Sequence, residues 1–152
     1  MICTFFGHKD TPESVKLSLE AAIRRIIKKY PDITFYVGHN GNFDRMVLSV
    51  LKYLSQDFPT ISYAVILAYL PTGKSTERYN VLPTIYPEGI ENTPLKYAIS
   101  YRNNWIVKQA DIIVCYITHN YGGAVQFVKK AKNMGKTVYN VANLYENIDF
   151  FV

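Results

Sequence analysis

Apolar positions along the chain fall alternately into short strand-like runs and longer stripes at helical spacing. The first run, 2–6, ends at Gly7 and is followed by Thr-Pro-Glu at 11–13. This triplet supplies a capping residue (Thr11), a proline for the first helical position and an acid in the first turn. Apolar residues then recur every three or four positions as far as Pro31. The pattern predicts a strand followed by an amphipathic helix.

The same order of elements continues to the end of the chain. The run 61–70 is almost continuously apolar, as expected for a strand that is covered on both faces in a parallel sheet. Gly135 is placed to cap the C-terminus of the last helix. The pattern predicts further strands at 33–37, 61–70, 112–117 and 137–141, and further helices at 43–54, 94–109 and 124–131.

Alternating strands and helices with right-handed connections indicate an α/β fold in which helices cover both faces of the sheet. We predict a single domain over 1–152, a Rossmann-like three-layer α/β/α arrangement with a mainly parallel sheet of about five strands. The stretch 71–93 interrupts the pattern with several prolines and glycines. It is either a functional binding loop or lid, or a flexible linker.

Composition agrees with a globular protein, because apolar residues make up 49% of the chain and charged residues 19%. The N-terminus lacks the features of a secretory signal, and no apolar run approaches the ~20 residues of a membrane span. Cys3 and Cys115 lie in apolar runs, where a free cysteine acts as a small hydrophobe. We expect a cytoplasmic protein without a membrane partner. We also expect a homo-oligomer, although the sequence does not fix its size.

Charge alone does not select a partner. The chain carries 17 Lys and Arg against 12 Asp and Glu, a formal net charge of +5. Such a balance is compatible with nucleic acid or with phosphorylated ligands. Many of the cations fall on helical faces that are typical of solvated surfaces. Nucleic-acid binding is therefore possible but not favoured.

Three glycine-containing loops follow the first, second and fourth predicted strands. The carboxyl ends of parallel strands meet at one edge of a sheet, where ligands of such folds bind. Glycine permits a ligand to approach the backbone closely, and the N-terminus of the following helix attracts an anion. A phosphate group is therefore the expected ligand. The candidate ligand-binding residues in these loops are Gly7, His8, Lys9, Gly38, Asn40, Gly41, Asn42, Asp44, Asn120, Gly122, Gly123 and Ala124.

The three histidines of the chain all fall at these strand ends. A three-histidine metal site built from His8, His39 and His119 is conceivable. Their spacing has no local ligand signature, and we do not expect the three strands to be consecutive neighbours in the sheet. We therefore predict no metal and no cofactor, with the histidines hydrogen-bonded to the ligand or to the loop backbone.

The third predicted helix adds further candidates. Arg102 would form a bidentate contact with a phosphate, Tyr101 would stack on a base, and Asn103 lies beside them. Alternatively, Tyr101 is a core residue and Arg102 a surface cation. Asp44, Glu88 and Glu91 are the carboxylates near the expected site, available for ribose hydroxyls or for acid-base chemistry.

Several segments together resemble the SLOG superfamily, in particular a small stand-alone branch found in bacteria and their phages. The resemblance covers the chain from about Ile2 to Val141 and implies a Rossmann-like fold that binds nucleotides or nucleotide-derived ligands. The superfamily includes cytokinin-activating phosphoribohydrolases, a DNA-processing protein, and sensor domains for cyclic ADP-ribose-like signals in phage defence. The segments are ICTFFGHKDTP, FYVGHNGNFDRMV, LAYLP, TIYPEGIE, AISYRNNWIV and the GGA turn at 122–124.

The chain departs from the hydrolase branch of that superfamily, whose motif has the form PGGxGTxxE. The paired glycines are present as Gly122 and Gly123, but Lys129 stands at the position of the catalytic glutamate. The resemblance therefore implies a binding protein that senses or sequesters a nucleotide or an ADP-ribose-like ligand. The alternatives are an N-glycosidic-bond hydrolase that uses Asp44 or Glu88, and a protein that binds single-stranded DNA.

Overall fold

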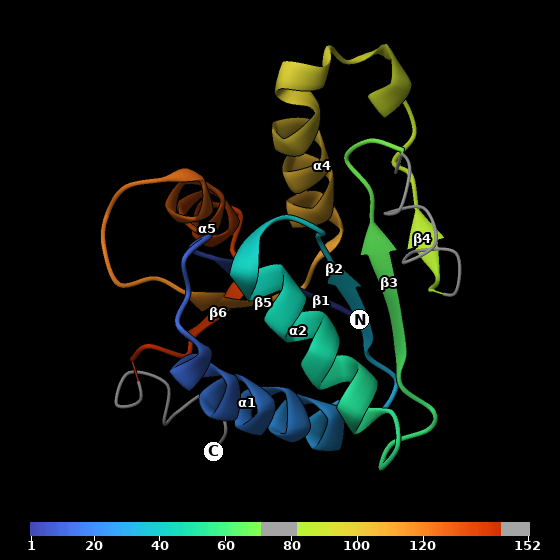
Figure 1. Cartoon of the computed structure of the whole chain (residues 1–152), viewed down its shortest axis with the longest axis vertical. Helices are drawn as coiled ribbons and strands as arrows, with labels where there is room; N and C mark the ends of the chain where they lie inside the picture. Colours follow the sequence, from blue (N-terminus) through green and yellow to red (C-terminus); the bar gives the residue numbers. More distant parts are fainter. Residues whose placement is uncertain (71–81, 144–152) are drawn as a thin grey trace.

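The computed structural model describes residues 1–70 and 82–143 (Figure 1). Six parallel strands form one sheet, in the order β4-β3-β2-β1-β5-β6. The structure thus confirms a parallel α/β fold, with one strand more than the sequence predicts. The strands are β1 (Ile2–Gly7), β2 (Thr34–Val37), β3 (Ser62–Ile66), β4 (Thr84–Ile85), β5 (Ile112–Tyr116) and β6 (Thr137–Asn140).

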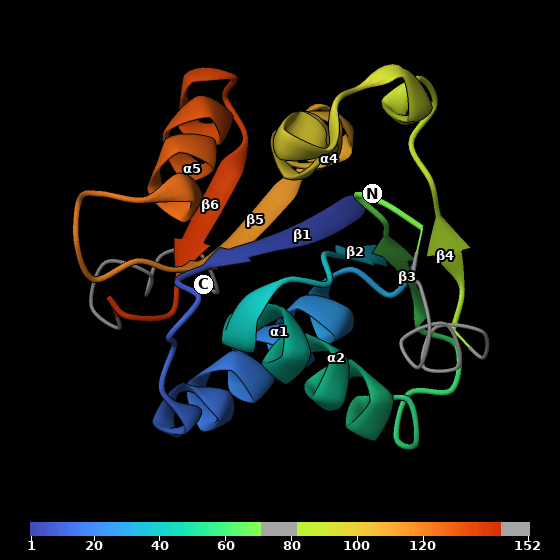
Figure 2. The ribbon, with the colours of Figure 1, turned by 45° about the horizontal axis from the view of Figure 1, so that its top comes forward.

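Helices cover both faces of this sheet, as the sequence predicts. The helices α1 and α2 lie on one face and α4 and α5 on the other (Figure 2). Within the described residues, no helix combines the length and the apolar character that crossing a membrane requires. The bounds are α1 (Lys16–Lys29), α2 (Gly41–Leu54), α4 (Leu95–Gln109) and α5 (Gly123–Asn133), with short 3-10 turns η1 (Glu13–Val15) and η2 (Ile90–Asn92).

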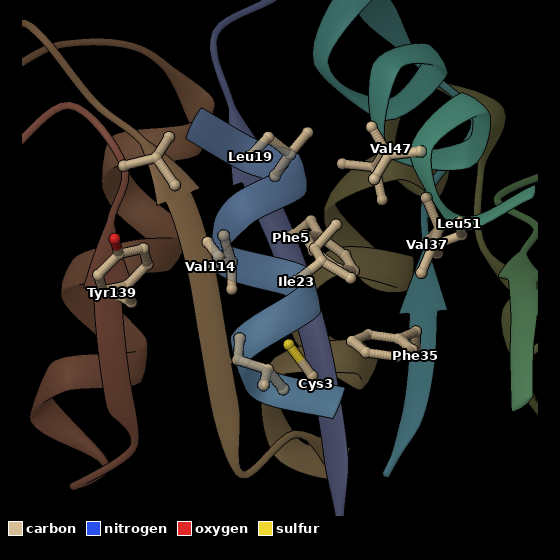
Figure 3. Close-up of a cluster of buried hydrophobic side chains, with 14 of the residues drawn as sticks. Cys3, Phe5, Leu19, Ile23, Phe35, Val37, Val47, Leu51, Val114 and Tyr139 are labelled. Atoms are coloured by element: carbon tan, nitrogen blue, oxygen red, sulfur yellow. The ribbon is translucent and has the colours of Figure 1, made fainter. Parts of the chain in front are cut away.

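Alternation along the central strands divides the core into two clusters. Cys3 and Phe5 of β1 face α1 and α2, where they pack with Leu19 and Ile23 (Figure 3). Phe6, the next residue of β1, packs into the cluster beneath α4 and α5. Because both faces are buried, a central strand needs apolar residues at successive positions. This explains the continuous apolar runs in the sequence. Both cysteines are buried and free, as predicted.

The additional strand β4 lies in the stretch that the sequence analysis assigned to irregular structure. Its two residues pair with the end of β3, and the Leu67 N–H donates to the Ile85 carbonyl oxygen at 2.8 Å. Two residues are too few to produce a recognisable alternation. Flanking prolines, Pro83 and Pro87, are tolerated because β4 is an edge strand.

Two predicted boundaries were wrong. The run 61–70 is a strand only as far as Ile66, although Leu67 and Ala68 remain buried. Thr11 does not cap a helix, because its hydroxyl donates to the His8 carbonyl oxygen at 2.6 Å and Pro12 occupies the capping position. Apolarity reports burial and does not report where a strand stops pairing, which accounts for the first error.

The end of α5 agrees with its prediction. Gly135 has a left-handed backbone conformation (φ 76°), which favours glycine. Its N–H donates to the Lys132 carbonyl oxygen at 3.0 Å, and the Lys136 N–H donates to the Ala131 carbonyl oxygen at 3.0 Å. These two bonds form a Schellman motif that ends the helix and leads into β6.

The order of strands contradicts one expectation. β1 lies between β2 and β5, so the three strands whose loops carry the histidines are consecutive neighbours. Connections from β1 run toward β2 and β3, and the chain then returns to the opposite side of β1 with β5. This reversal makes the β1/β5 boundary the topological switch point, where ligands bind in open α/β sheets.

Candidate functional site

A cavity of about 510 Å³ opens at the carboxyl ends of β1, β2 and β5. Its walls come from the loops after these strands, from one side of α4 and from the first turns of α5. This is the sheet edge that the sequence analysis selected. The lining residues are Phe5, Phe6, Gly7, His8, Lys9, Asp10, Gly38, Asn40, Asp44, Ile99, Ser100, Arg102, Asn103, Ile106, His119, Tyr121, Gly122, Gly123, Ala124, Gln126 and Phe127.

Most of the predicted ligand-binding residues line this cavity, and the others lie elsewhere. The Tyr101 hydroxyl donates to the Glu88 carbonyl oxygen at 2.7 Å, so both residues lie outside the cavity wall. Gly41 opens α2 beside Lys9, and the Asn42 N–H donates to the Lys9 carbonyl oxygen at 3.0 Å. Gly41 and Asn42 therefore contact the loop after β1 and do not line the cavity. Predicted residues in the wall are Gly7, His8, Lys9, Gly38, Asn40, Asp44, Arg102, Asn103, Gly122, Gly123 and Ala124.

A second cavity of about 340 Å³ lies between α5 and the strands β5 and β6. Asn120 lines it, and His119 contributes to both cavities. Lys129, which stands at the position of the glutamate in the hydrolase motif, also lines this second cavity. Neither Asn120 nor Lys129 is therefore in the wall of the larger cavity.

The guanidinium of Arg102 is held inside the wall of the larger cavity. The residue is only 3% exposed, which rules out a surface cation. Its Nη1 donates to the Asn40 Oδ1 at 2.9 Å, and its Nε donates to the Asn103 Oδ1 at 3.0 Å. The Asn40 amide also donates to the Tyr69 hydroxyl at 3.1 Å. These contacts tie α4 to the loops after β2 and β3.

Asp44 lies close to Arg102 at the beginning of α2. Its Oδ2 accepts the Asn40 N–H at 2.9 Å. The carboxyl group and the guanidinium both crowd Gly38, where a Cβ would lie 2.6 Å from the Asp44 Oδ2 and 3.3 Å from the Arg102 Cζ. Burial raises the pKa of Asp44 to about 6, while Arg102 and the Asn40 N–H act in the opposite direction.

The glycine pair before α5 leaves an open space. Gly122 has a φ of 102°, a backbone conformation that favours glycine, and a Cβ at either Gly122 or Gly123 would meet no atom within 4 Å. The first amides of a helix have no acceptor within the helix and attract an anion. Both glycines line the cavity, so the N-terminus of α5 opens toward it.

Gly7 serves a different purpose on the opposite side of the cavity. A Cβ there would lie 2.2 Å from the Phe43 Cγ, so glycine is required for α2 to pack against the end of β1. This close approach fixes the loop that carries His8 and Lys9. Lys9 is exposed and directs a second positive charge to the cavity.

The histidines do not form a common site. His8 stacks on His119, with ring centroids 3.6 Å apart, whereas the His39 Nε2 accepts the Ala68 N–H at 3.0 Å. Burial lowers the pKa of His39 to about 4, and the charge of Arg102 adds to this effect. In the part of the chain that the structure describes, no three His, Cys, Asp or Glu side chains gather as metal ligands.

The sequence suggested His119 only as a metal ligand or a hydrogen-bonding histidine, and it did not identify several other cavity residues. His119 stacks on Tyr121 as well as on His8, which makes a column of three rings at the cavity rim. The position of Tyr121 directly before the glycine pair was a usable signal. Gln126 and Phe127 lie one turn into α5, and their helical spacing from Gly123 places them on the cavity side. The other lining residues that were not predicted are Phe5, Phe6, Asp10, Ile99, Ser100 and Ile106.

The raised pKa of Asp44 makes its contribution to stability depend on pH. The folded protein retains the Asp44 proton up to about pH 6, whereas the ordinary aspartate value is 3.8. The contribution of Asp44 to stability is thus fully present below pH 3.8 and is lost as the pH rises through about 6. We expect the unfolding free energy of the wild type, relative to Asp44→Asn, to increase by about 1.4 kcal/mol per unit as the pH falls through this range. Urea unfolding of both proteins at a series of pH values measures it. A constant difference would mean that Arg102 and the Asn40 N–H offset the effect of burial and leave the pKa of Asp44 at its ordinary value.

Comparisons with known proteins give a fold and no family. No family model matches the chain, and no curated protein matches its sequence. Among solved structures, the chain is similar to DNA processing protein A (DprA) from Streptococcus pneumoniae, with a TM-score of 0.66 and 14% sequence identity. The likeness covers 91% of this chain and 49% of that chain, so this chain spans about half its length. At this identity the match establishes the Rossmann-like parallel α/β fold.

Proposed function

We propose that this domain binds a nucleotide or an ADP-ribose-like ligand in the larger cavity and acts as a sensor or a sequestering protein. The observation that carries the proposal is the position of this cavity at the switch point of a parallel sheet, between the open N-terminus of α5 and the buried guanidinium of Arg102. The volume of about 510 Å³ falls in the range of small-molecule sites.

The cavity offers the chemistry that a phosphate requires. The backbone at Gly122 and Gly123 is accessible because no side chain covers it. Arg102 and Lys9 supply positive charge from two other elements. Arg102 is already fixed by Asn40 and Asn103, so little side-chain entropy would be lost on binding. These features favour an anionic ligand that is held at several points.

A hydrolase of N-glycosidic bonds is the second candidate, and Asp44 is the observation that favours it. A buried carboxyl group with a pKa near 6 in a cavity wall has the properties of a general acid or base. Glu88 does not share this role, since it lies outside the wall. The hydrogen bond from the Asn40 N–H and the proximity of Arg102 give Asp44 an equally good structural role.

Native mass spectrometry of gently purified protein, followed by calorimetry with a panel of nucleotides and ADP-ribose, tests the proposal. We expect one-to-one binding without turnover. Multiple turnover of a compound at low protein concentration would favour the hydrolase. The similarity to a DNA-processing protein and the formal charge of +5 make single-stranded DNA a further probe. An affinity that is confined to DNA and falls steeply with salt would replace the proposal.

A side chain that fills the space in front of α5 should interfere with phosphate binding. Gly123→Val should lower the affinity for the tightest nucleotide of the panel at least ~10-fold, because the side chain would occupy the space that a phosphate needs. Folding should change little, since a Cβ at Gly123 meets no atom within 4 Å. Calorimetry measures the affinity. The control is Asn133→Val, which places the same side chain at the other end of α5. Wild-type affinity in a folded Gly123→Val protein would exclude a phosphate at this turn.

The planar shape of the Arg102 side chain should matter for binding as well as its charge. Bidentate contacts depend on a planar guanidinium, so Arg102→Lys should weaken binding almost as much as Arg102→Ala. Losing a hydrogen bond to a charged group corresponds to an affinity drop of about 10- to 150-fold. Because Arg102 is buried against Asn40, both variants should also lose on the order of 1–3 kcal/mol of stability.

Calorimetry measures the ligand affinity of the Arg102 variants after circular dichroism has verified that they are folded. Arg45→Ala is the matched control, because it removes an exposed guanidinium from the neighbouring helix α2. Wild-type affinity in Arg102→Ala would remove the residue from the site. Full rescue by lysine would reduce its role to that of a point charge.

A further inference from the structure

Three aromatic rings form a column at the rim of the larger cavity. His8 and His119 stack with their centroids 3.6 Å apart and an angle of 16° between the rings. His119 and Tyr121 stack at 3.8 Å and 17°. His119 is therefore enclosed between two nearly parallel rings. The column runs from the buried His8, which is 8% exposed, to Tyr121, which is 68% exposed.

The inner end of the column is fixed by hydrogen bonds. The His8 Nε2 accepts the Thr118 N–H at 3.1 Å, which requires the imidazole to be unprotonated at that nitrogen. The His8 carbonyl oxygen accepts the hydroxyl and the N–H of Thr11. The Thr118 bond connects the loop after β5 to the loop after β1, and the two Thr11 bonds lie within the loop after β1. Burial and the neighbouring His119 lower the pKa of His8, whereas Asp10 raises it. The net lowering favours a neutral ring.

The middle ring is held by stacking. Among the described residues, His119 makes no side-chain hydrogen bond, and its Nδ1 is buried without a partner. A buried unpaired nitrogen is unfavourable, so such groups in native proteins are rare and require an explanation. The explanation that the geometry offers is the alignment of Tyr121, whose orientation depends on the ring beneath it.

The outer ring has one face left for a ligand. Tyr121 lines the cavity directly before the glycine pair and covers His119 with one face. With 68% of the residue exposed, the opposite face of the ring is open. We infer that this face of Tyr121 is the stacking platform for the base of a nucleotide whose phosphate lies at Gly122 and Gly123. The inference rests on the proposed function and assigns its ligand to the class that carries an aromatic base.

A stacking platform predicts a particular kind of specificity. Stacking contributes to binding with any base, because every base has a π-face, and it does not distinguish hydrogen-bonding edges. Stacking on an aromatic residue contributes about a 5- to 150-fold gain in affinity per base. Purine nucleotides should therefore bind somewhat more tightly than pyrimidine nucleotides, and all of them more tightly than ribose 5-phosphate, which has no base.

The test compares AMP and ribose 5-phosphate by calorimetry in four proteins, the wild type and three variants. In the wild type, AMP should bind about 5- to 150-fold more tightly than ribose 5-phosphate. Tyr121→Leu should abolish this difference and leave the affinity for ribose 5-phosphate unchanged, whereas Tyr121→Phe should retain the difference. Tyr53→Leu is the control, because Tyr53 is an exposed tyrosine near the C-terminal end of α2, outside the cavity lining.

The outcomes separate this inference from the proposed function. Equal affinities of the wild type for AMP and ribose 5-phosphate would overturn the platform and leave an anion site. The same conclusion follows if Tyr121→Leu weakens both compounds equally or leaves the difference intact. If neither compound binds the wild type at millimolar concentration, the platform and the proposed nucleotide site are both overturned.

Discussion

The site depends on a buried guanidinium that must be paired. Moving a charged group out of water is strongly unfavourable unless hydrogen bonds and an opposite charge compensate for it. Arg102 meets this requirement with Asn40 and Asn103, next to the carboxyl group of Asp44. Because Asn40 lies at the start of α2 and Arg102 in α4, the pairing joins helices from opposite faces of the sheet at the carboxyl end of β2. The cavity is bounded by the elements that this pairing holds together.

Two glycines at the carboxyl ends of β1 and β2 allow the close packing around this pairing. Gly38 leaves room for the Asp44 carboxyl group and the Arg102 guanidinium, since a Cβ would collide with the Asp44 Oδ2. Gly7 leaves room for Phe43, the apolar residue with which α2 reaches the end of β1. In both loops glycine is required by close packing and leaves no open space. Open space occurs at Gly122 and Gly123, which distinguishes a turn available to a ligand from turns occupied by the protein itself.

The sequence predicted the elements well because their signals are local. Within residues 1–70 and 82–143, periodicity located the four helices and five of the six strands, and the buried faces agree with the expected alternation. Strand order is not a local property. Nothing in the spacing of the chain shows that β5 returns to the far side of β1, and the expectation for the histidine-bearing strands was wrong for that reason.

The same limit applies to the candidate site. Loop glycines and the residues beside them were identified because their chemistry is visible in the sequence. The burial of Arg102 and the separation of Tyr101 from the cavity depend on which face α4 turns to the sheet. The column of His8, His119 and Tyr121 joins positions more than 100 residues apart, and only the pairing of β1 with β5 brings them together.

The burial that holds the site together also links it to protons. Burial, with the charge of Arg102 as a second cause, lowers the pKa of His39, whereas burial raises the pKa of Asp44 in spite of Arg102. As the pH falls through about 6, Asp44 takes up a proton and His39, with its pKa of about 4, remains neutral. The wall then loses the negative charge of Asp44, while His39, which lies outside the wall, stays uncharged. An anion bound beside Arg102 would in turn favour the protonated form of Asp44, because linkage is reciprocal. For an anion whose own charge does not change in this pH range, affinity would therefore rise as Asp44 is protonated.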